Sequence, residues 1–212
     1  MSTRFELLLD AVDQFLTRNH QDDLDQFLVE TFGACASSSS TFERRYSTLM
    51  LKEMLASRFR QPPQRDFYAS MEYLIEEYRY MGRREAFWLV IIVTHGEADF
   101  GLNQISRAMQ VGEQVAQNLR HRPGAILLLD IVSERQWEKR ALSAFCESAS
   151  ISPIQVPDVG RIGAYLSEVE SLLARAHVST GLFGRRFTHP VDCAFLLDCT
   201  SEMMNDSQGR NR

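Results

Sequence analysis

The residues with the clearest capacity for chemistry are His95, Gly96 and Glu97, which directly follow an apolar run and a threonine. The run, Ala86 to Val93, holds eight consecutive apolar residues and is rich in valine and isoleucine. A run of this length, closed by a turn signal, predicts a buried strand of a parallel sheet. Open α/β sheets bind their ligands outside the carboxyl ends of the strands. The sequence therefore predicts an imidazole, which can exchange a proton near neutral pH, at that edge.

Four cysteines could supply a nucleophile or a metal ligand, namely Cys35, Cys146, Cys193 and Cys199. No two of them form a C-x-x-C pair, which argues against a redox or zinc motif. A set made of His189, Cys193 and Cys199 matches no zinc spacing and lacks a fourth ligand. We therefore expect no metal and no cofactor, and free thiols in a reducing compartment rather than a disulfide framework.

Length and charge exclude several classes of protein. The chain has 212 residues, of which 44% are hydrophobic, so one main core is expected. The net charge is −5 and the arginine pairs are scattered, whereas a nucleic-acid-binding surface needs clustered basic residues. The longest apolar run is far shorter than a membrane span, and acidic residues interrupt the first apolar stretch, unlike in a signal peptide. We expect a cytoplasmic protein with no nucleic-acid or membrane partner.

The elements that must position His95 alternate between helices and strands. Apolar residues at three- and four-residue spacing predict helices over 48–59, 67–81, 105–119 and 165–176. Apolar runs predict strands over 86–93, 125–132 and 191–197. The first two strands with the helix between them form a βαβ unit, whose crossover should be right-handed. Residues 137–145 fit a helix or a linker, and residues 153–159 fit an extended segment or a loop.

The two ends of the chain have patterns of their own. Residues 5–16 and 24–32 both show helical spacing, which predicts a helical N-terminal extension over residues 1–32. This extension could dock a partner, although packing against the main domain is favoured. The polar residues 203–212 predict a disordered tail.

This order of elements resembles the large-subunit half of a caspase. The segment Val93-Thr94-His95-Gly96-Glu97, with Phe100-Gly101 after it, is similar to the family segment that carries the catalytic histidine. Arg122-Pro123 and the strand after it resemble the strand that delivers the catalytic cysteine, and the stretch from Phe42 to Thr48 resembles an upstream family motif. The resemblance covers roughly residues 33 to 137. It implies a caspase-like three-layer α/β/α sandwich with a mostly parallel central sheet over residues 33–202.

Within this frame the catalytic set is incomplete. His95 corresponds to the catalytic histidine, Gly96 to the glycine whose N–H faces the oxyanion, and Arg45 to an arginine of the substrate pocket. The nucleophile position falls on Ile131, and the glutamine position on Leu129. Isoleucine cannot form an acyl-enzyme, so the resemblance implies an inactive homologue with no intact catalytic site.

The resemblance therefore implies a pseudo-caspase. Residues 131–136 are also similar to the segment that replaces the active-site loop in a catalytically inactive caspase homologue. We expect a protein that binds caspases or death-pathway adaptors, forms a homo- or heterodimer, and modulates apoptotic or innate immune signalling. Pairing of sheet edges through the 191–197 strand is the expected route.

Three alternatives stay open. Cys146 lies 51 residues after His95, near the family interval of about 50, so a divergent cysteine endopeptidase using this pair is the alternative function. His95 could instead be a structural residue that hydrogen-bonds a backbone carbonyl, with Gly96 a turn glycine. The chain could also be an unrelated α/β binding module in which the His-Gly-Glu motif is a coincidence.

Overall fold

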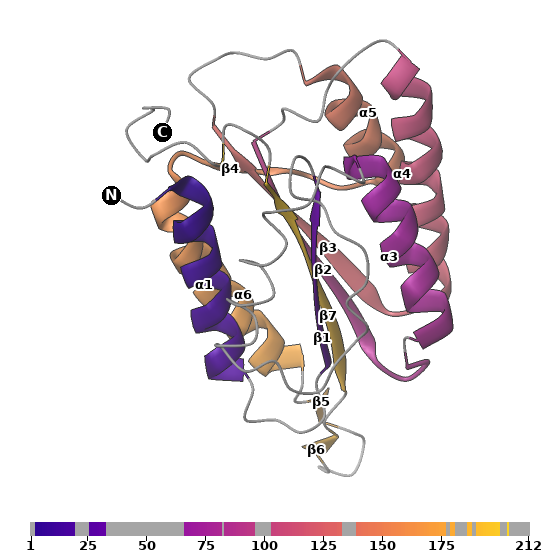
Figure 1. The fold of residues 1–212 in the computed structure, drawn as a ribbon. Coiled ribbons are helices and arrows are strands. Elements are labelled where there is room, and N and C mark those ends of the chain that lie inside the picture. Colours follow the sequence, from indigo (N-terminus) through magenta and orange to yellow (C-terminus); the bar gives the residue numbers. More distant parts are fainter. Residues whose placement is uncertain are drawn as a thin grey trace.

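The computed structural model describes residues 3–19, 26–32, 66–81, 83–95, 103–132, 139–176, 179–180, 186–187, 190–199 and 203. Over these residues the fold is α/β, with one five-stranded sheet in which all strands are parallel and helices pack on both faces (Figure 1). The expected three-layer architecture with a parallel central sheet and an N-terminal helix is confirmed. No described helix is both long and apolar enough to cross a membrane.

The sheet has the strand order β1-β7-β2-β3-β4. Its strands are β1 (Gln26–Phe32), β2 (Phe87–Thr94), β3 (Gly124–Ile131), β4 (Ile154–Val156) and β7 (Val191–Asp198). The helices are α1 (Arg4–Asn19), α3 (Phe67–Met81), α4 (Asn103–His121), α5 (Arg140–Ala149) and α6 (Ile162–Ala176), with the 3-10 turn η1 (Val159–Arg161) before α6. A separate antiparallel pair consists of β5 (Ser179–Thr180) and β6 (Arg186–Phe187).

Two hydrophobic clusters lie on opposite faces of the sheet because successive strand residues point to opposite sides. In β7, Phe195 and Leu197 belong to the cluster under α1 and α6, while Ala194 and Leu196 belong to the cluster under α3, α4 and α5. Both faces are covered, so all eight residues of β7 are buried. The prediction that the apolar run over 86–93 forms a buried parallel strand is confirmed by β2, and the strands predicted over 125–132 and 191–197 are present as β3 and β7.

Residues 26–32 form a strand where the sequence predicted a helix. The segment QFLVETF pairs in parallel with β7 along its whole length, and six of its seven residues are buried. Spacing by three and four residues also arises in a short strand that is apolar on both faces, so periodicity alone could not separate the two. Of the predicted N-terminal helices, α1 is therefore present, and β1 belongs to the main sheet.

The strand predicted as a sheet edge lies inside the sheet. β7 pairs with β1 on one side and with β2 on the other. The prediction that residues 191–197 offer an edge for partner pairing is wrong, because the backbone of β7 is already paired with a strand on each side. Among the described strands, β1 and β4 occupy the edges.

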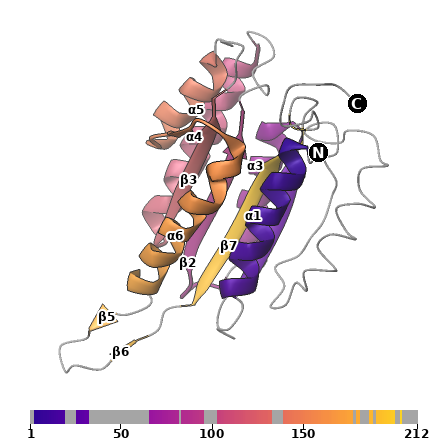
Figure 2. The same cartoon turned by 90° about the vertical axis from the view of Figure 1, so that its left-hand side faces the viewer.

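Helix α1, which precedes β1 in the chain, contacts the segment that follows β7. The backbone N–H of Phe5 donates to the carbonyl of Met203 at 2.8 Å, and Met203 is fully buried, although the composition placed it in a disordered tail. Figure 2 shows α1 and α6 on the same face of the sheet, where Arg18 pairs with Glu170 at 2.9 Å. Numbered 1 to 5 in chain order, the strands of this sheet lie in the order 1-5-2-3-4, because β7, the last of them in the chain, lies between β1 and β2.

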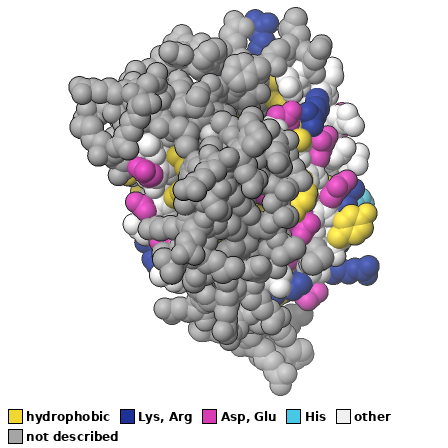
Figure 3. Space-filling view, viewed as in Figure 1, with side chains coloured by type: hydrophobic (Ala, Val, Ile, Leu, Met, Phe, Trp, Pro, Cys, Tyr) yellow, Lys and Arg dark blue, Asp and Glu magenta, His cyan; other side chains and the backbone are white. Residues whose placement is uncertain are grey.

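Helices α3, α4 and α5 cover the other face of the sheet. Arg107 of α4 pairs with Asp66 at 2.8 Å and with Glu72 at 3.0 Å, which ties α4 to α3. Acidic and basic side chains are interspersed along this side of the molecule (Figure 3). Helices α4 and α5 are in close contact at Gly112, where an added Cβ would lie 2.7 Å from the carbonyl oxygen of Phe145.

We predict opposite effects for two helical Gly→Ala substitutions. Gly112→Ala should lower the free energy of unfolding by about 1–3 kcal/mol, because the methyl group would collide with the backbone of α5. Gly163→Ala in α6 is the matched control, since its added Cβ meets nothing within 4 Å. That variant should be unchanged or more stable, by up to about 1 kcal/mol. Denaturant titration measures both, and a Gly112→Ala variant as stable as the wild type would contradict the close packing of α4 on α5.

Candidate functional site at the carboxyl ends of β2 and β7

Polar residues meet where β2 and β7 end. Thr94 and His95 close β2, while Asp198 and Cys199 close β7. The two strands are parallel and pair Val93 with Leu197, so their ends lie next to each other. These residues lie at the carboxyl edge of the sheet, the edge at which open α/β sheets bind ligands.

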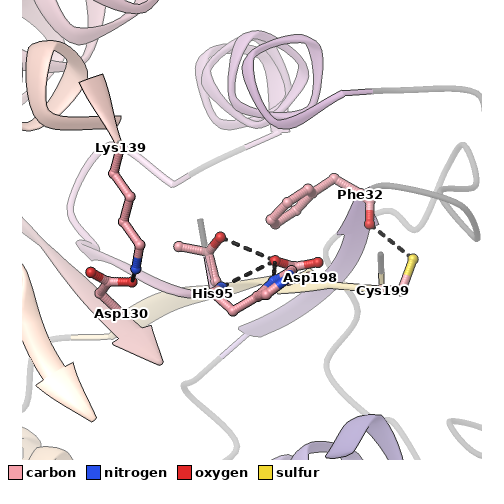
Figure 4. A network of polar contacts seen from close by, with 7 residues as sticks. Phe32, His95, Asp130, Lys139, Asp198 and Cys199 are labelled. Atoms are coloured by element: carbon pink, nitrogen blue, oxygen red, sulfur yellow. Dashed lines mark hydrogen bonds and ion pairs between the residues drawn. The ribbon is translucent and has the colours of Figure 1, made fainter. Parts of the chain in front are cut away.

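One oxygen of Asp198 makes three hydrogen bonds with the end of β2 (Figure 4). The His95 ring nitrogen Nδ1 lies 2.7 Å from Asp198 Oδ2. The Thr94 hydroxyl donates to the same oxygen at 3.1 Å, and the His95 backbone N–H donates at 3.2 Å. The Asp198 carboxylate thus contacts the imidazole and the backbone N–H of His95 and the hydroxyl of Thr94.

Both members of the pair are buried. His95 is 1% exposed and Asp198 is fully buried. A carboxylate in such a place needs hydrogen-bond donors to offset the loss of water, and β2 supplies them. The prediction that His95 bonds a backbone carbonyl at the strand end is corrected here, because its Nδ1 partner is a carboxylate.

Ile131 lies at the neighbouring strand end. Thr94 pairs with Asp130 in the β2–β3 ladder, so His95 and Ile131 each follow that pair by one residue. Ile131 is 2% exposed and packs in the cluster that includes Val93 and Leu129. The position aligned with the caspase nucleophile is therefore next to the histidine strand and is filled by a buried aliphatic side chain.

A second polar group lies at the end of β3. Asp130 pairs with Lys139, which precedes α5 (Figure 4). Asp130 also accepts a hydrogen bond from the Gln155 amide at 2.7 Å. Asp130 is 4% exposed, so these two donors stabilise a buried carboxylate. The group links β3, β4 and α5, which is a structural role.

Cys146 lies on α5 within the cluster under α3, α4 and α5. Burial, followed by the charge of Asp130, raises the pKa of this thiol to about 11. A thiol with such a pKa is almost entirely protonated near neutral pH, whereas a catalytic cysteine reacts as a thiolate. The local chemistry of Cys146 thus favours a structural thiol.

The other predicted residues have different outcomes. Gly96 and Arg45 lie outside the described residues. Cys193 and Cys199 are buried and form no disulfide. The Cys199 thiol contacts the carbonyl oxygen of Phe32 (Figure 4), and its Sγ lies 2.9 Å from that oxygen. Within the described ranges, no group of three or more His, Cys, Asp and Glu side chains is arranged to hold a metal ion.

Asp198 and Thr94 are site residues that the sequence interpretation missed. Asp198 ends the apolar run of β7 just as His95 follows that of β2, so both were candidates for the same sheet edge. Their meeting depends on β7 lying beside β2, which no local pattern predicts. The available signal was an ionisable residue at the end of each of these two apolar runs, His95 after β2 and Asp198 in β7.

We predict that Cys146 reacts slowly with iodoacetamide in the folded chain at pH 7.5. Its pKa of about 11 leaves almost no thiolate at that pH, and labelling should accelerate as the pH approaches 11 while the fold persists. Site-resolved mass spectrometry measures the modification, and the same chain unfolded in guanidinium gives the reference rate. Labelling of folded Cys146 at the unfolded rate would show an exposed, ordinary thiol and contradict its burial.

Comparison with known proteins adds no assignment. No family model matches the chain, and neither a curated protein nor a solved structure matches it.

Proposed function

We propose that this chain is a non-catalytic, caspase-like domain that binds caspases or their adaptors and thereby modulates apoptotic or innate immune signalling. The resemblance at Val93 to Glu97 supports the family assignment. The position of this motif adds to that support, because His95 follows a central strand of a parallel sheet. The alignment also requires the histidine and nucleophile positions to lie at adjacent strand ends, as His95 and Ile131 do.

Ile131 is the observation that carries the non-catalytic part of the proposal. Its side chain packs in the core at 2% exposure, so the residue beside the histidine strand offers neither a nucleophile nor access to a substrate. Covalent catalysis of the caspase type needs a thiolate within reach of the histidine. The imidazole meanwhile pairs with Asp198, which gives His95 a role in holding β2 to β7.

The route of partner binding must differ from the one expected. β7 has a strand on each side and is not proposed again as a docking edge. The edge strand β4 has only three residues and lies between Pro153 and Pro157, which have no N–H to offer a partner strand. Short, proline-flanked edges resist strand addition. We therefore propose that partners contact side-chain surfaces rather than the β4 backbone.

The alternative function, a cysteine endopeptidase using His95 and Cys146, has less support. Cys146 belongs to the cluster under α3, α4 and α5, and its raised pKa disfavours the thiolate. No geometric feature of the described residues favours this pair over the non-catalytic proposal.

The purified chain of 212 residues tests the proposal in a direct binding assay. It should bind at least one purified caspase or adaptor saturably, and it should change that caspase's cleavage of an Asp-containing fluorogenic peptide. Alone, it should cleave no such peptide. An unrelated α/β protein of similar size and net charge is the control for non-specific binding.

Two outcomes would overturn the proposal. Absence of binding across a panel of caspases and adaptors would refute the claim that the chain binds these proteins. Peptidase activity that is lost in Cys146→Ala, but kept in the matched buried-thiol variant Cys193→Ala, would establish the endopeptidase instead.

A further inference from the structure

The three hydrogen bonds on Asp198 determine more than the position of His95. Two of the donors, the Thr94 hydroxyl and the His95 backbone N–H, approach Oδ2 together with the ring nitrogen Nδ1. A backbone N–H can only donate, so Oδ2 must act as an acceptor there. Hydrogen bonds donated to a carboxylate oxygen favour its ionised form.

We propose that Asp198 is the positioning residue of His95 and keeps a proton on its Nδ1. An ionised Oδ2 at 2.7 Å can only accept, so Nδ1 must donate. The lone pair of the neutral imidazole then resides on Nε2. A carboxylate that holds one ring nitrogen as a donor is the arrangement that fixes the orientation and tautomer of histidines whose other nitrogen acts as a base or a ligand.

The two ring nitrogens of His95 consequently have different roles. Nδ1 is committed to Asp198 and couples β2 to β7, so any proton that His95 takes up is added at Nε2. This assignment goes beyond the proposed function, because it concerns the state of the site and holds whether or not the chain binds a caspase.

The other end of β7 provides a matched control. Asp192 is as fully buried as Asp198 and pairs with Arg83, whose Nη2 and Nε lie 2.6 and 2.9 Å from Asp192 Oδ1. The two carboxylates occupy opposite ends of one strand. Asp192→Asn therefore weakens a buried pair on β7 without touching His95, which separates a general loss of stability from an effect on the imidazole.

Nitrogen-15 NMR of the His95 ring in the full chain tests the assignment, because the two nitrogen shifts report which of them carries the proton. In the wild type and in Asp192→Asn, Nδ1 should be protonated at pH 7. Asp198→Asn, which keeps an acceptor oxygen, should also keep the proton on Nδ1. Asp198→Leu, which removes the acceptor at similar volume, should move the proton to Nε2 or leave the two tautomers in exchange.

A bare Nδ1 with the proton on Nε2 in the wild type would overturn the proposal. An unchanged Nδ1–H state in Asp198→Leu would overturn it as well, because the tautomer would then not depend on Asp198. If Asp198→Leu does not fold, the wild type and Asp198→Asn decide: protonated Nδ1 in both supports the assignment, and a bare Nδ1 in either refutes it.

Discussion

The rest of the structure depends on how β7 is held between β1 and β2. All eight of its residues are buried, and a buried carboxylate lies at each end. At the amino end, Asp192 accepts from the Arg83 side chain and also from the Arg83 backbone N–H at 2.8 Å. At the carboxyl end, Asp198 accepts from Thr94 and His95. Breaking a buried pair of this kind typically costs about 3–5 kcal/mol, so the polar ends specify the position of β7 while its apolar middle supplies the burial.

The proposed function gives His95 a structural role, and the geometry of the residue supports this proposal. His95 lies at the carboxyl edge of the sheet, yet its imidazole is buried and its Nδ1 contacts the neighbouring strand. The adjacent strand end presents Ile131, which packs into the core. A scaffold whose carboxyl edge is filled at β2 and β3 by its own hydrogen bonds and apolar side chains is suited to binding through its outer surface, as the proposed function requires.

Local patterns predicted much of the fold. The helices α3, α4 and α6 follow from hydrophobic spacing, because a single packing face produces that pattern. The strands β2, β3 and β7 follow from unbroken apolar runs, because hydrophobic clusters lie on both faces of the sheet. The helix predicted over residues 24–32 failed because β1 is buried on both faces, which removes the alternation of a half-exposed strand. The place of β7 in the sheet could not be predicted, since it depends on tertiary pairing. His95 was identified from its motif, whereas Asp198 was missed because its role exists only once β7 lies beside β2.

The most direct measurement of this account is a double-mutant cycle on His95 and Asp198, read as the free energy of unfolding of His95→Ala, Asp198→Ala and the double variant. If the two residues hold β2 to β7 as a pair, each single substitution leaves its partner buried and unmatched. The loss of unfolding free energy in the double variant should then be smaller than the sum of the losses in the two single variants, by about 1–3 kcal/mol. Losses that add to within about 0.5 kcal/mol would contradict the account, because the two side chains would then act independently.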